Sequence, residues 1–249
     1  MVSRKTASPM PPAGARAADH FVAELHPVAR ATATLRRRRR LAVWRIGVSA
    51  VYGLKRSIDL AGAAFGTLLL APVFILTALA IKLEDRGPVF YAQTRVGLHG
   101  RNFRMFKFRS MVVDAERLQR KLDAQNESVA GVLFKMRDDP RITRVGRLIR
   151  KLSIDELPQL FNVLGGSMSI VGPRPPLPRE VEQYTQEERM RLEVKPGITC
   201  IWQVSGRSEI DFQGQVRLDL DYIRGRSFLG DIALILRTIP VVLLGKGAY

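Results

Sequence analysis

Residues 60–81, LAGAAFGTLLLAPVFILTALAI, decide the fold, because these 22 residues contain no charged side chain. A transmembrane helix needs about 20 apolar residues to cross a hydrocarbon core of about 30 Å, so this segment is just long enough. An uncharged run of this length argues against a buried core helix of a soluble domain. We therefore predict that the segment lies in a membrane.

Two features predict that the segment does not cross straight through. Pro72 lies near its middle, where a proline removes a helix hydrogen bond and clashes with the preceding turn. Basic residues flank both ends: Lys55, Arg56, Lys82 and Arg86. A single crossing usually has its positive charge on one side. We expect a re-entrant helix-break-helix over residues 55–83, with a kinked full span as the alternative.

The region before this segment is strongly basic. The formal net charge is +17, and residues 1–56 contain 12 Lys and Arg against two acidic residues. Residues 1–35 are rich in Pro and Ala and are predicted to be a disordered basic tail. Residues 36–54 begin with five arginines and continue as an amphipathic juxtamembrane segment. Such a segment suits an anionic leaflet, while a solvated run or a nucleic-acid arm is the alternative.

The remaining residues, 84–249, are predicted to form a cytosolic catalytic domain. Residues 89–111, VFYAQTRVGLHGRNFRMFKFRSM, indicate two strands around a turn at 97–100. The C-terminal apolar run is interrupted by Arg237 and Pro240, which favours an interfacial helix over a spanning one. The predicted fold class is mainly α with a small β-hairpin, in a monotopic membrane protein with interfacial amphipathic helices.

Asp155 and Glu156 are the candidate catalytic residues. They lie in KLSIDELPQLFNVL, directly before an apolar helical pattern. Ser153 and Glu156 have the spacing of a capping box, so Glu156 could serve only to cap a helix. A carboxylate near a helix N-terminus, where N–H groups attract phosphate oxygens, is also a plausible nucleophile or metal ligand. The residues alone leave both interpretations open.

Basic side chains surround this pair in the sequence. Arg141, Arg144 and Arg147 are spaced three residues apart, which would place them on one helical face, facing phosphates or lipid headgroups. Arg174 lies between prolines that fix its backbone, and Arg207 follows a glycine. A carboxylate pair among many arginines suits phosphate transfer.

Other classes of site are absent from the sequence. It contains no P-loop, no Rossmann glycine pattern, no Ser/His/Asp set and no zinc-ligand spacing. A nucleic-acid-binding motif is also missing, so we expect no nucleic-acid partner. Cys200 is the only cysteine, which excludes an intrachain disulfide and fits a reducing cytosolic environment.

Several stretches, in order from residue 55, carry a family resemblance: KRSIDLAGA, GPVFYAQTRVG, FKFRSM, DDPRITRVGRLIRKLSIDELPQLFNVLGGSMSIVGPRP, KPGIT, WQVSGR and LDLDYI. On these residues the chain resembles the bacterial sugar transferase family, the monotopic polyprenyl-phosphate phosphoglycosyl transferases. It looks most similar to members that initiate exopolysaccharide synthesis.

The resemblance implies transfer of a hexose 1-phosphate from a UDP-sugar to undecaprenyl phosphate, with release of UMP and with Mg²⁺ as cofactor. Asp155 matches the family nucleophile, which forms a covalent aspartyl sugar-phosphate, and Glu156 matches its acidic partner. Both are candidate metal ligands. The resemblance assigns phosphate binding to Lys107, Arg109, Arg174 and Arg207. Asp219 and Tyr222 match an accessory segment, and Pro72 matches the proline that breaks the membrane helix.

The implied location is the bacterial inner membrane, with the catalytic domain on its cytosolic face. The implied partners are the UDP-sugar, undecaprenyl phosphate and membrane lipids, and then a second copy of the chain and downstream glycosyltransferases. The sequence leaves the identity of the sugar open. Two alternatives stay open as well: a membrane-tethered adaptor without turnover, and a glycosyltransferase that moves only the sugar and releases UDP.

Overall fold

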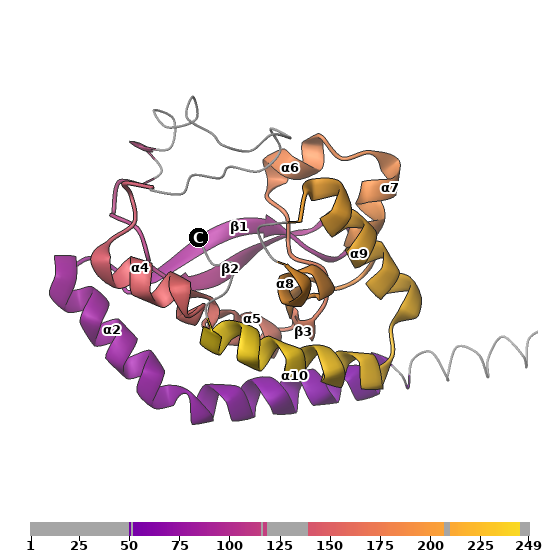
Figure 1. Ribbon diagram of the computed structural model, residues 1–249, viewed down its shortest axis with the longest axis horizontal. Coiled ribbons are helices and arrows are strands. Elements are labelled where there is room, and N and C mark those ends of the chain that lie inside the picture. The colour runs from indigo at the N-terminus through magenta and orange to yellow at the C-terminus, as the bar shows by residue number, and fades with distance from the viewer. Residues whose placement is uncertain (1–49, 51, 116, 119–138, 207–209, 245–249) are drawn as a thin grey trace, which may run out of the picture. The chain divides into compact units, whose positions relative to one another are not determined.

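The computed structural model describes residues 50, 52–115, 117–118, 139–206 and 210–244 (Figure 1). The chain divides into two units, Met1–Leu54 and Lys55–Tyr249, and the second contains the folded elements discussed below. The predicted tail at 1–35 and nearly all of the predicted juxtamembrane segment at 36–54 lie outside the described residues.

The segment that decides the fold is a bent pair of helices. The helix Tyr52–Leu69 and α2 (Ala71–Asp85) meet at 59°, and Pro72 lies in the first turn of α2 (Figure 1). At that position a proline removes no intrahelical hydrogen bond, so it starts the second helix where the first has ended. The predicted break is confirmed. Within the described residues no single helix is long and apolar enough to cross a membrane, whereas this pair together meets that length and composition.

The predicted β-hairpin is also present. Strands β1 (Phe90–Val96) and β2 (Asn102–Phe108) pair antiparallel around the short 3₁₀ turn η1 (Leu98–Gly100). His99 and Gly100 both have positive φ angles, 54° and 75°, which reverse the chain within a few residues. The register places Lys107 opposite Tyr91.

Helices form most of the remaining structure, as the sequence predicts. They are α4 (Arg144–Lys151), η3 (Ile154–Glu156), α5 (Gln159–Leu164), α6 (Pro178–Glu182), α7 (Gln186–Arg189), η4 (Met190–Glu193), α8 (Ile201–Ser205), α9 (Phe212–Gly225) and α10 (Phe228–Leu244). The apolar C-terminal run is the 17-residue helix α10, which contains Pro240.

A second, parallel sheet was not predicted from the sequence. It pairs β3 (Ser169–Val171) with β4 (Gly197–Thr199). Strands of three residues are too short to show the alternation that identifies a strand. The two segments approach closely at Gly172 and Gly197, where an added Cβ on Gly197 would meet the Gly172 backbone at 2.1 Å.

The start of α4 corrects one prediction. Thr143 caps this helix by accepting a hydrogen bond from the Gly146 backbone, and the helix begins at Arg144. Arg141 therefore precedes the helix instead of sharing a face with Arg144 and Arg147. Its guanidinium pairs with Asp139 two residues earlier, which holds it outside the helix.

A small apolar core joins the first helix to the hairpin and to α5. Its fully or almost fully buried members are Ala63, Met105, Val163 and Met168. The Asn162 side chain fixes α5 to β2, because it accepts a hydrogen bond from the Phe106 backbone and donates one to the Arg104 carbonyl.

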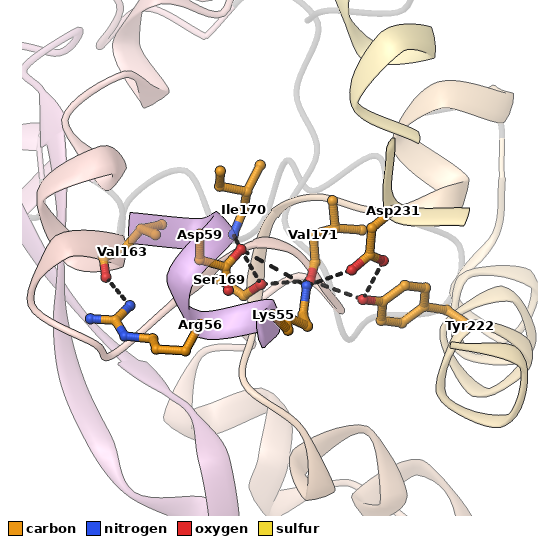
Figure 2. A network of polar contacts seen from close by, with 9 residues as sticks. All are labelled: Lys55, Arg56, Asp59, Val163, Ser169, Ile170, Val171, Tyr222 and Asp231. Atoms are coloured by element: carbon orange, nitrogen blue, oxygen red, sulfur yellow. Dashed lines mark hydrogen bonds and ion pairs between the residues drawn. The ribbon is translucent and has the colours of Figure 1, made fainter. Parts of the chain in front are cut away.

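A polar network attaches the first helix to the C-terminal part of the chain (Figure 2). Lys55 donates to Asp231 of α10 at 2.6 Å, and the Asp231 carboxylate also accepts from Tyr222 of α9 at 3.0 Å. The Asp59 carboxylate accepts from the Ser169 hydroxyl at 3.1 Å. Elements that are more than 100 residues apart in the sequence are thereby held side by side.

Large apolar side chains are exposed along three helices. On the bent pair they are Tyr52, Leu54, Leu60, Phe65, Leu68, Leu69, Ile75, Leu76, Leu79 and Leu83. On α10 they are Phe228, Leu229, Ile232, Leu236 and Ile239. Soluble proteins rarely expose so much contiguous apolar surface unless it meets a membrane or a partner.

Candidate active site

Asp155 and Glu156 lie in the 3₁₀ turn η3, between α4 and α5. Ser153 precedes the turn with a left-handed backbone, φ 54°, and its side chain makes no capping hydrogen bond. The Glu156 carboxylate instead accepts a hydrogen bond from the Lys107 ammonium at 2.8 Å. The capping box that the spacing allowed is therefore not formed, and both carboxylates are available to a site.

Lys107 connects the hairpin to this pair of carboxylates. Its Nζ lies 2.8 Å from Glu156 Oε1 and 3.9 Å from Asp155 Oδ2. The Arg174 guanidinium lies 3.9 Å from the same Glu156 oxygen. Two of the predicted phosphate-binding cations are thus within 4 Å of the carboxylates.

The two carboxylates have opposite pKa shifts. Burial raises the pKa of Asp155 to about 6, against the attraction of Lys107. Burial also acts on Glu156, but the attraction of Lys107 and Arg174 outweighs it and lowers the pKa of Glu156 to about 2. Near pH 7 Glu156 is ionised, and Asp155 is mostly ionised but holds its charge less favourably. A buried, weakly paired carboxylate has the character of a nucleophile or base.

Arg174 is presented by the loop that follows β3. Pro173 and Pro175 flank it, and its guanidinium lies over the Trp202 ring at 5.9 Å. About 39% of its side chain is exposed, so the cation has one side on the indole and the other open to a ligand.

The other predicted phosphate-binding arginines lie in different environments. Arg109 is buried and forms a two-pronged pair with Asp85 at the end of α2. Arg141 is buried against Asp139, whereas Arg144 is exposed at the start of α4. Arg207 lies outside the described residues. Lys107 and Arg174 are therefore the predicted cations that the described structure brings to the carboxylates.

The two accessory residues are buried parts of α9. Asp219 pairs with Arg191, whose Nε lies 2.9 Å away, and burial raises the pKa of Asp219 to about 6. Tyr222 donates to Asp231 and to the Val171 carbonyl, and burial raises the pKa of its hydroxyl far above the usual value. Neither contact involves Asp155 or Glu156.

The carboxylate pair fits a magnesium ion that is shared with a substrate. Magnesium is usually held by one or two carboxylates together with substrate phosphates and water. Asp155 and Glu156 provide two such carboxylates at adjacent positions. In the described part of the chain no group of three or more His, Cys, Asp and Glu side chains could hold a metal by itself.

A cleft that is partly open to solvent adjoins Glu156, and the empty space of about 210 Å³ around it includes open solvent. It is lined by Met105, Lys107, Glu156, Gln159, Arg174, Pro175, Gly197, Ile198 and Gln203. Gln159 and Gln203 were not predicted from the sequence. For Gln159 the sequence did contain a signal that could have found it, because this polar residue starts the apolar helical run in PQLFNVL.

Nearly all of the chain from the first helix onward matches a known family. The sequence profile described as bacterial sugar transferase matches residues 50–245. The chain belongs to the bacterial sugar transferase family. This confirms the family predicted from the motifs, and with it the prediction of a transferase enzyme.

Curated relatives agree with this assignment. The galactosyl transferase CpsE of Streptococcus agalactiae is 51% identical over 78% of this chain and 43% of its own length. The exopolysaccharide production protein ExoY of Sinorhizobium fredii is 39% identical over 78% of this chain and 88% of its own. The undecaprenyl-phosphate galactose phosphotransferase of Salmonella typhimurium is 43% identical over 79% of this chain and 42% of its own length. The chain thus spans less than half of two of these relatives and most of the third.

Proposed function

We propose that the chain transfers a hexose 1-phosphate from a UDP-sugar to undecaprenyl phosphate and releases UMP. The observation that carries this proposal is the buried Asp155 carboxylate, with its pKa raised to about 6, beside a Glu156 that Lys107 and Arg174 hold ionised. The names of the relatives support the same chemistry, because one is a galactose phosphotransferase that uses undecaprenyl phosphate.

In the first step an Asp155 carboxylate oxygen attacks the β-phosphorus of the UDP-sugar. A bond forms between this oxygen and the phosphorus, and the bond from the phosphorus to the oxygen that bridges the α-phosphate breaks. UMP leaves with that oxygen, and an aspartyl sugar-phosphate remains. Lys107 and Arg174 are placed to stabilise negative charge on the diphosphate as it develops.

In the second step a phosphate oxygen of undecaprenyl phosphate attacks the same phosphorus. The acyl-phosphate bond breaks, the Asp155 carboxylate is restored, and the product is the undecaprenyl-diphosphate sugar. The bond between the sugar and its phosphate oxygen is never broken, which separates this reaction from one that releases UDP. The order of the steps predicts ping-pong kinetics.

Asp155 and Glu156 are the residues that would hold Mg²⁺ in this site. A bound magnesium ion supplies charge neutralisation at the diphosphate. Lys107 keeps Glu156 ionised for this role, because its ammonium lies 2.8 Å from the carboxylate.

The exposed apolar helices support a membrane location for the enzyme. The bent pair and α10 carry most of the large apolar side chains that are exposed in the described residues, and such a surface is stable in contact with lipid tails. With the break at Pro72 and basic residues at both ends, we propose a re-entrant pair on the cytosolic face of the bacterial inner membrane, with α10 at the interface. This location puts the site within reach of a lipid-anchored acceptor.

The decisive assay measures UMP release from a panel of UDP-sugars with undecaprenyl phosphate in detergent. The wild-type protein should release UMP and form a covalent sugar-phosphate adduct with the correct donor. Asp155→Asn should abolish both, whereas Asp221→Asn, a matched change at an exposed carboxylate on α9, should preserve both. An adduct that persists in Asp155→Asn would disprove the nucleophile assignment, and release of UDP in place of UMP would disprove the reaction.

A further inference from the structure

Gln159 is a buried polar residue that the proposed chemistry does not use. It is the first residue of α5, four residues after Asp155, and only 3% of it is exposed. It lines the cleft together with Lys107 and Glu156. Its side-chain amide forms no hydrogen bond with any residue in the described part of the chain. The fully enclosed, unpaired side-chain atoms of the described residues do not include those of Gln159, so its amide is at the cleft surface, where it can exchange hydrogen bonds with a ligand.

The cleft is lined by charged, neutral polar and apolar residues. Lys107, Glu156 and Arg174 are charged, whereas the two amides, Gln159 and Gln203, are neutral and polar. The remaining lining residues are apolar or glycine: Met105, Pro175, Gly197 and Ile198. The charged side chains suit phosphate, and the two amides suit a group that exchanges hydrogen bonds without carrying charge.

We infer that the Gln159 amide binds the sugar of the donor through its hydroxyl groups. This inference rests on the proposed function. In that reaction the β-phosphorus lies at Asp155, and the sugar is attached directly to the β-phosphate. Gln159 begins α5 four residues after Asp155 and lines the same cleft as Glu156, on the side of the site where the donor would lie. The amide donates from Nε2 and accepts at Oε1, and both match a sugar hydroxyl.

The same lining argues for the sugar and against the uridine. In the described part of the chain no aromatic side chain lines the cleft, whereas a base is commonly held by stacking on one. The side chains that line the cleft therefore suit the sugar better than the base.

The test compares a donor with the same nucleotide lacking its sugar. Gln159→Met keeps the length of the side chain and removes both hydrogen-bonding groups. It is made in the full chain in an Asp155→Asn background, so that binding is measured without turnover. Calorimetric affinities for UDP-galactose, UDP-glucose and UDP are then compared. Loss of one hydrogen bond should weaken binding of the preferred UDP-hexose about tenfold and leave UDP unchanged.

Two controls separate a ligand contact from a structural effect. Gln186→Met makes the same change at an exposed position on α7 and should leave all three affinities unchanged. Gln159→Asn keeps an amide but shortens it, and should weaken the UDP-hexose selectively as well. Unchanged UDP affinity in each variant also shows that the site is folded.

Several results would overturn the inference. An equal loss for UDP and for both UDP-hexoses would assign Gln159 to the nucleotide or to the fold, and no loss for any ligand would exclude a contact. Neither result depends on UMP release. The wild-type protein could release no UMP while Gln159→Met still weakened binding of the UDP-hexose and left UDP binding unchanged. In that case the proposed reaction would fail and the sugar contact would stand.

Discussion

Removing Lys107 should shift the pH dependence of the first chemical step. Asp155 must be ionised to attack phosphorus, so the rate should fall as the pH drops through its pKa, which is about 6. Lys107 lowers that pKa by attraction from 3.9 Å. Lys107→Met removes the attraction and raises the pKa of Asp155, so the loss of rate should begin at a higher pH.

The size of the shift follows from the separation of the charges. At 3.9 Å and an effective dielectric constant of about 20, the attraction is about 4 kcal/mol. At about 1.4 kcal/mol for each pKa unit, this corresponds to a shift of about three units. Water entering the vacated space and the remaining charge of Arg174 reduce the shift. We expect the midpoint of the acidic limb to rise by about one to three units.

The assay is single-turnover UMP release between pH 5 and pH 9, with the wild-type protein and Lys107→Met. The position of the acidic limb is read separately from the maximal rate, which also falls if Lys107 binds the diphosphate. Because Asp155 and Glu156 interact, the midpoint belongs to the pair. Arg101→Met is the matched control: it removes an exposed cation six residues along the strand from Lys107, about 20 Å away.

An unchanged acidic limb in an active Lys107→Met protein would refute the electrostatic argument. An equal shift in Arg101→Met would also refute it, since a charge about 20 Å away is largely screened at physiological salt. A downward shift would mean that Lys107 acts on Asp155 mainly by excluding water.

Two further predictions concern topology and stability. Ser57→Cys and Lys82→Cys, made singly, should both react with a membrane-impermeant thiol reagent from the cytosolic side only. The background labelling should be low, because the native Cys200 is buried. Labelling of the two positions from opposite sides would show a full span. Arg191→Met should lower stability by about 3–5 kcal/mol, because it leaves the buried Asp219 carboxylate unpaired, and should lower the unfolding temperature in detergent by about 6–20 °C. The double variant Arg191→Met, Asp219→Leu should recover much of that loss, and a double variant less stable than the single one would contradict the reasoning.

Some features of the protein follow from local sequence. The uncharged run at 60–81 and Pro72 predict two helices with a break, because a proline acts on its own turn. The β1–β2 hairpin follows from alternation around a glycine-containing turn. The ordered motifs predict the family, since together they cover most of the chain after residue 55. Each of these signals lies within one stretch of chain, so each can be read without the fold.

The tertiary structure decided which partner each side chain has. The spacing of Ser153 and Glu156 allowed a helix cap, but Lys107, 49 residues away in the sequence, binds Glu156 instead. Arg109 had the same sequence context as Lys107, yet it pairs with Asp85. The sequence also predicted neither the parallel β3–β4 pairing nor the unpaired amide of Gln159. Such pairings depend on distances between segments far apart in the chain, and these distances are set only when the helices and strands pack together.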